Sequence, residues 1–115
     1  MKYFSDKKIK WISGKTYKKK ILLEDIKDKI NLIEDIIIKP LGEVPLHKHQ
    51  YTKEVFYITE GKPIFRNTKK NIQLKEEELI FIDKEEAHGF INKTKRRVKL
   101  ICFKINHRKG DSYLS

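Results

Sequence analysis

Short apolar and aromatic runs, separated by turn residues at regular intervals, constrain the fold of this chain more than any other feature. Valine, isoleucine and aromatic side chains favour strands, whereas glycine, proline, asparagine and aspartate favour the turns between them. The pattern predicts strands at residues 18–23, 31–39, 46–49, 54–60, 63–67, 71–74, 78–82, 88–92 and 98–106. Strands of this length and spacing are typical of an all-β barrel or sandwich. One segment stays open, because residues 24–34 admit a helix on the spacing of Ile26, Ile30 and Ile33 but also a turn.

Length and composition indicate one cytoplasmic domain. The 115 residues suffice for a single hydrophobic core, and the recurring aromatic and β-branched residues argue against disorder. No run of about eighteen apolar residues is present, and the N-terminus lacks the apolar segment of a signal peptide. The single cysteine, Cys102, cannot form an internal disulfide and fits a reducing compartment. Because the strand that carries Cys102 is apolar on both faces, a buried, unreactive thiol is expected.

The net charge of +11 raises the question of a nucleic-acid partner. Lysines cluster at residues 18–20 and 93–99. Only four of the 27 basic residues are arginines, the side chain that reads bases through paired hydrogen bonds. We therefore interpret the clusters as solvated strand ends and turns rather than as a nucleic-acid footprint.

Three histidines and one glutamate form the most informative constellation. His47 and His49 are two residues apart, so both imidazoles point to one face of an extended segment. Glu54 starts a face that continues with apolar residues, and a carboxylate in that position is costly unless a cation pairs with it. His88 lies on another short strand. Such donors suit Mn, Fe, Co, Ni, Cu or Zn and are poor for Mg or Ca. His107, in a polar tail without a partner, is expected to lie outside any site.

Two spaced motifs resemble those of the cupin superfamily. The first comprises Gly42, His47, His49, Glu54 and Gly61, and the second comprises Asp83, Glu85, His88 and Asn92. The resemblance implies an antiparallel cupin-type β-barrel or jelly roll over residues 18–115. It also implies that His47, His49, Glu54 and His88 bind a divalent transition metal. Asn92 is expected to hold a turn or donate hydrogen bonds rather than bind the metal.

The second motif departs from the family pattern at its turn positions. Asp83 and Glu85 stand where the family has proline and glycine, and Glu77 occupies the opening glycine position. In the first motif, one residue is missing between Gly42 and His47. We expect an unusual turn before His88, with all four ligand positions intact.

The function implied is that of a small metal-binding cupin acting on or binding a small molecule. Four protein ligands leave open metal positions, where an oxygen donor could be polarised. Dioxygenase- or isomerase-like chemistry and non-catalytic binding stay equally open, because a fold does not define its chemistry. No catalytic residue is assigned. The apolar wall of the site is expected to comprise Phe56, Ile58, Phe90 and either Phe81 or Ile82.

Residues 1–17 form an aromatic-rich N-terminal arm ahead of the barrel. Exposed apolar segments of this kind mark interfaces, so the arm predicts a homodimer. The alternative is an arm folded back over its own barrel. The residues concerned are Tyr3, Phe4, Ile9, Trp11, Ile12 and Tyr17.

Overall fold

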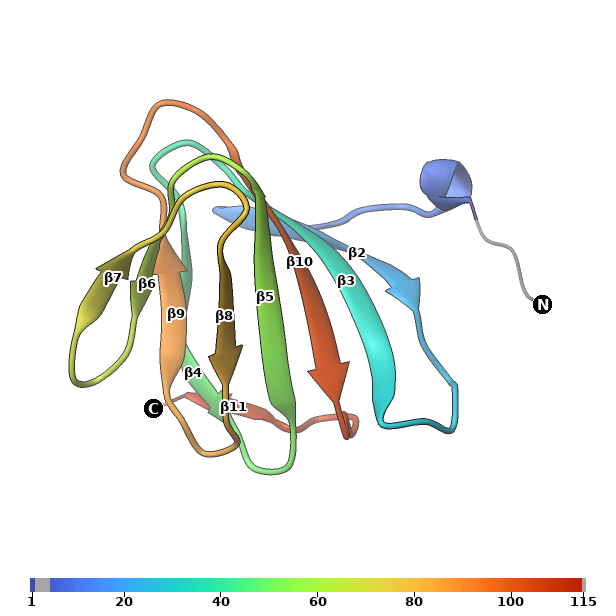
Figure 1. Cartoon of the computed structure of the whole chain (residues 1–115). Coiled ribbons are helices and arrows are strands. Elements are labelled where there is room, and N and C mark those ends of the chain that lie inside the picture. Colours follow the sequence, from blue (N-terminus) through green and yellow to red (C-terminus); the bar gives the residue numbers. More distant parts are fainter. Residues whose placement is uncertain (2–4, 115) are drawn as a thin grey trace.

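Two antiparallel sheets face each other in the computed structural model, which describes residue 1 and residues 5–114 (Figure 1). A short 3-10 helix, Asp6–Lys8, precedes them. The six-stranded sheet has the order β1 (Ile12–Ser13), β2 (Tyr17–Leu23), β3 (Ile30–Ile38), β10 (Val98–Ile105), β5 (Lys53–Glu60) and β8 (Leu79–Ile82). The five-stranded sheet has the order β11 (Ser112–Leu114), β4 (Glu43–His49), β9 (His88–Ile91), β6 (Ile64–Arg66) and β7 (Asn71–Gln73). No helix in this described part of the chain is long and apolar enough to cross a membrane.

The hydrophobic core lies between the two sheets and is formed by the inward rows of their strands. Along β10 the buried and half-buried positions alternate, as a strand with one face toward the core requires. Leu100 of this row lies opposite Ile36 of β3 and Ile58 of β5. The buried core residues are Ile36, Ile38, Phe56, Ile58, Phe65, Leu74, Ile82, Phe90, Val98, Leu100 and Cys102. The predicted all-β, jelly-roll fold is therefore confirmed, and Cys102 is buried as expected.

The helical interpretation of residues 24–34 is wrong. Bends occupy residues 25 and 27–29, and β3 begins at Ile30. Asp25 has a φ of 57°, which reverses the chain so that β3 can pair with β2. Pairing of β3 with both β2 and β10 outweighs the helical spacing of the isoleucines. Two short strands, β1 and β11, are not predicted by the sequence pattern.

Three turn positions near the motifs adopt positive φ. Gly61 has a φ of +89°, which glycine tolerates without strain. Glu77 and Glu85 have φ values of 67° and 65°, although neither is glycine. These are the positions where the family pattern has glycine, so the left-handed backbone is present there without the residue that favours it.

The N-terminal arm is described only in part. Tyr3 and Phe4 lie outside the described residues. Ile12 is exposed in β1, whereas Tyr17 belongs to β2 and packs against the core. Trp11 lies beneath the ammonium groups of Lys18 and Lys20, at 4.8 and 4.6 Å from its ring centre. The homodimer and the boundary at residue 17 stay predictions.

Candidate metal centre

The four predicted ligands meet at one end of the interior. His47 and His49 extend from β4, Glu54 from the start of β5 and His88 from the start of β9. The register brings them together, because His47 lies opposite His88 in the β4–β9 pair. One donor atom from each residue can be chosen so that all lie within 4.8 Å of one another. His49, Glu54 and His88 are 4%, 2% and 1% exposed, whereas His47 is half-buried.

Backbone carbonyl groups orient all three imidazole rings. Each Nδ1 lies within hydrogen-bond distance of a carbonyl oxygen, so each Nδ1 carries the proton and donates it. The contacts are His47 to Pro45 (2.8 Å), His88 to Glu86 (2.9 Å) and His49 to Asp111 (3.1 Å). When such a ring is neutral, its Nε2 keeps a lone pair, which is the arrangement found around metal-binding histidines.

The donor atoms at the centre of the cluster have no hydrogen-bond partner. Glu54 Oε1 lies 2.7 Å from His49 Nε2 and 2.8 Å from His88 Nε2. All three atoms are fully buried, and none of these contacts has hydrogen-bonding geometry. Two imidazole lone pairs and a carboxylate oxygen repel one another at such distances unless a cation lies among them. The residues therefore fit a divalent ion, and the cluster is capable of holding one.

The protonation states of the cluster suit metal binding. Burial is the largest cause, and the neighbouring His88 the next, of a shift that lowers the pKa of His47 to about 4. That imidazole is therefore neutral at physiological pH and free to donate its lone pair. Burial opposes ionisation of Glu54, but protons on the facing Nε2 atoms of His49 and His88 outweigh it and hold the pKa of the carboxyl well below its usual range. A bound metal ion would take the place of those protons. Glu54 is accordingly a carboxylate.

Cys102 supports Glu54 from the side opposite the histidines. Its Sγ donates to Glu54 Oε2 at 3.2 Å, which leaves Oε1 for the cluster. Burial and the Glu54 charge raise the pKa of the Cys102 thiol well above its usual range. The thiol therefore keeps its proton and acts as a donor, not as a nucleophile.

The C-terminal segment braces the loop between β4 and β5. The Asp111 side chain accepts hydrogen bonds from the backbone N–H groups of Gln50, Tyr51 and Thr52 and from the Thr52 hydroxyl. Its backbone carbonyl is the one that orients His49. Strand β11 continues this contact by pairing with β4. Local sequence carries no sign of this role, because Asp111 is about sixty residues from its partners.

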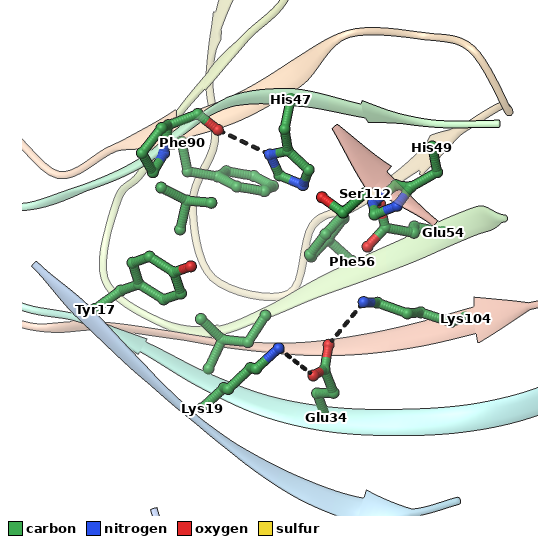
Figure 2. A pocket seen from close by; sticks show the side chains of 13 residues that line it. Tyr17, Lys19, Glu34, His47, His49, Glu54, Phe56, Phe90, Lys104 and Ser112 are labelled. Carbon is green, nitrogen blue, oxygen red and sulfur yellow. Dashed lines mark hydrogen bonds and ion pairs between the residues drawn. The ribbon is translucent and has the colours of Figure 1, made fainter. Parts of the chain in front are cut away.

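The cluster opens into a pocket of about 250 Å³ (Figure 2). Its apolar lining comprises Tyr17, Ile36, Val44, Pro45, Phe56 and Phe90. Its polar lining beyond the cluster comprises Lys19, Glu34, Lys104 and Ser112. An apolar wall with a few convergent polar groups is typical of small-molecule sites.

The chain matches the sequence model of the cupin domain family over residues 35–104, a range that includes all four residues of the cluster. This protein belongs to the cupin family. A curated relative, the oxalate-binding protein of Thermotoga maritima, is 30% identical over 69 residues. That match covers 60% of this chain and spans only 57% of the relative's length.

Solved structures share the fold of this cupin. A Klebsiella pneumoniae protein with a double-stranded β-helix domain has a TM-score of 0.81 at 15% identity and covers 100% of this chain and 97% of its own. A "predicted oxalate decarboxylase" from Thermotoga maritima has a TM-score of 0.75 at 22% identity and covers 92% and 100%. At these identities the likeness shows the fold alone.

The pocket wall of the cupin differs in part from expectation. Phe56 and Phe90 line the pocket as predicted. The prediction of either Phe81 or Ile82 in the wall is wrong for both residues. Phe81 is 50% exposed on the outer face of β8, and Ile82 is buried in the core without lining the pocket. Ile58 is also wrong in this role, since it is fully buried in the core beyond the pocket.

Two further residues lie outside the cluster, and Asn92 has the hydrogen-bonding role predicted for it. The Asn92 amide donates to the carbonyl groups of Lys39 and Arg96, and its Oδ1 accepts from Thr94. Asn92 therefore holds a turn. His107 is not among the clustered residues and instead bonds through its backbone to Asn31.

Three charged pocket residues are not predicted by the sequence motifs. Glu34 of β3 accepts ion pairs from Lys19 of β2 and Lys104 of β10, both at 3.2 Å. The alternation of inward and outward side chains along a strand could have identified Glu34 and Lys104. Glu34 shares its face with Ile36 and Ile38, and Lys104 shares its face with Leu100 and Cys102, so both should point inward.

Proposed function

We propose that this cupin holds a divalent transition metal through His47, His49, Glu54 and His88, and that the metal binds a small oxygen-donor molecule in the adjoining pocket. The observation that carries the proposal is the convergence of buried Nε2 and Oε1 atoms without hydrogen-bond partners. Three imidazoles and a carboxylate suit Mn, Fe, Co, Ni, Cu or Zn. When bound, such an ion supplies a Lewis acid with open positions.

The residues of the chain prepare the site for an entering ligand. Carbonyl groups hold the three rings in one tautomer, and the Cys102 thiol holds one Glu54 oxygen. Phe56 and Phe90 form a wall that excludes water from one side of the pocket. These contacts set the donor atoms in place before an ion or a ligand arrives, which lowers the cost of binding.

A small carboxylate is the ligand class that we favour. The name of the Thermotoga maritima relative, an oxalate-binding protein, supports it. The charges of the pocket favour binding over proton-transfer chemistry, because both described carboxylates in it are engaged, Glu34 with two lysines and Glu54 with the cluster. Dioxygenase- or isomerase-like turnover is the second candidate, since the open metal positions would also suit a reacting substrate.

The test of the metal centre is elemental analysis of protein purified without added metal. We expect about one ion per chain in the wild type and in His107→Ala, which is the matched control. Single alanine variants of His47, His49, Glu54 and His88 should each lose most of the metal while keeping the β-sheet circular dichroism spectrum. Full metal content in His88→Ala, or equal trace amounts in all the proteins, contradicts the proposal.

A further inference from the structure

We propose that the ligand of this cupin is a small dicarboxylate, whose near carboxylate occupies the metal and whose far carboxylate binds Lys104 and Lys19. The inference rests on the proposed metal centre and adds a second recognition point to it. Figure 2 shows the two lysines and Glu34 across the pocket from His47, with Tyr17 and Phe90 along one side.

Lys104 is a buried lysine on the inner face of its sheet, where it lines the pocket. It is 9% exposed at an inward position of β10, and Glu34, its ion-pair partner, is 3% exposed. Desolvation of an ammonium and a carboxylate costs about as much as their attraction returns, so a buried pair is weak evidence for a stabilising role. A role in the pocket that both side chains line accounts for their position better.

The lysines retain hydrogen-bonding capacity for a ligand. An ammonium has three N–H donors. Within the described residues, Glu34 is the acidic partner of Lys104, and the same carboxylate also serves Lys19 through its other oxygen. Glu34 thus holds two ammonium groups side by side at the pocket. An incoming carboxylate would find donors on both of them.

The charge balance of the pocket suits a dianion when a divalent metal ion is bound. Lys19 and Lys104 balance Glu34 and Glu54, so the lining is neutral without an ion. Burial opposes the charge of Lys104, but Glu34 and Glu54 raise its pKa, which keeps the ammonium protonated. A divalent metal ion then leaves an excess of two positive charges, which one dicarboxylate neutralises.

The size and apolar middle of the pocket limit the ligand further. Its volume is about 250 Å³, which is room for a small molecule and not for a polymer. Phe56, Phe90 and Val44 offer apolar contacts for a short carbon chain between two charged ends. A short dicarboxylate with a carbon chain would use this apolar wall, whereas oxalate lacks a carbon chain to contact it.

The test is calorimetric titration of metal-loaded protein with acetate, oxalate, malonate, succinate and glutarate. We expect the wild type to bind one of the longer dicarboxylates more tightly than acetate or oxalate. Lys104→Met should weaken that dicarboxylate about tenfold or more and leave acetate within about twofold. The matched control is Lys99→Met, on the outer face of the same strand, where Lys99 pairs with Asp35 at 3.9 Å. It should bind like the wild type.

Further variants keep the test decisive. Lys19 is partly exposed, so Lys19→Met should fold and lose several-fold in dicarboxylate affinity. If Lys104→Met does not fold, the double variant Lys104→Met/Glu34→Gln removes both buried charges and should show the same loss.

Metal content is measured first in every protein. A loaded wild type that binds dicarboxylates no more tightly than acetate overturns this inference alone, as does equal binding by Lys104→Met. A wild type without metal overturns the proposed function instead.

Discussion

The two ends of the interior are built from the same strands but serve different purposes. At one end the inward rows are apolar and fully buried, with Ile38, Ile58, Val98 and Leu100 at 0% exposure. At the other end the same rows become polar. The polar members are Glu34 of β3, Glu54 of β5 and Lys104 of β10. The apolar end consists of buried hydrophobic side chains packed against one another. The polar end contains buried polar atoms without hydrogen-bond partners. Stability and ligand binding should therefore be separable by mutation.

The largest effect expected is on stability, from a change at the apolar end. Leu100→Ala removes a fully buried side chain and should lower the free energy of unfolding by about 3 kcal/mol. Urea unfolding in excess chelator measures this loss. The folded variant should still hold metal like the wild type, because Leu100 does not line the pocket. Ile101→Ala, on the outer face, is the control and should cost less. A folded Leu100→Ala protein without metal would break the separation.

Acid should destabilise the polar end of the metal-free protein. The unfolded chain protonates His47 near pH 6.5 and the folded protein only near pH 4, so the unfolded state binds more protons between these values. The free energy of unfolding should fall as the pH drops from 6.5 to 4, by on the order of 2 kcal/mol after allowance for partial exposure. His47→Gln should show a shallower fall in the same titration. Parallel profiles for the two proteins would contradict this reading of the site.

A smaller effect is expected where the two ends meet, at Cys102. Cys102→Ala removes the donor to Glu54 Oε2 and little volume, so metal affinity should fall about tenfold while stability changes little. Cys102→Ser retains a donor and should lose less. Competition with a chelator of known affinity measures both. Equal losses in the two variants would assign the effect to packing rather than to the hydrogen bond.

The smallest effect is expected at the exposed turn of Glu77, whose side chain is not among the clustered or pocket-lining residues. Glu77 has a positive φ and is exposed, so Glu77→Gly should raise the free energy of unfolding by about 0.5–1 kcal/mol without changing metal content. Glu76→Gly, where φ is not positive, should instead be slightly destabilising. Thermal unfolding of the two variants side by side provides the comparison. A loss of stability in Glu77→Gly would show that the turn needs the glutamate side chain.

Strand alternation and motif spacing predict the fold and the clustered residues. The parity of residues 54–58 predicts that Glu54 points inward, and the buried position of its side chain confirms this. The spacing of His47 and His49 likewise predicts a shared face, and both line the pocket. These features are local, because side chains two residues apart on a strand share a face wherever the strand lies.

The features that the sequence does not predict depend on contacts between distant segments. Asp111 reaches the loop at residues 50–52 only because β11 pairs with β4. The grouping of Glu34 with Lys19 and Lys104 depends on the order of β2, β3 and β10 in the sheet. Phe81 and Ile82 are not distinguished by the sequence, because a short strand of apolar residues has no polar position to reveal its inward face.

Anomalous diffraction from crystals of the metal-loaded protein tests the central claim most directly. Data collected above the absorption edge of the bound metal locate the ion without reference to the protein atoms. We expect one peak per chain, about 2.0–2.2 Å from Nε2 of His47, His49 and His88 and from an oxygen of Glu54. A peak at another position in crystals saturated with metal would contradict the account. So would a metal ion that is bound only by exposed side chains outside the cluster.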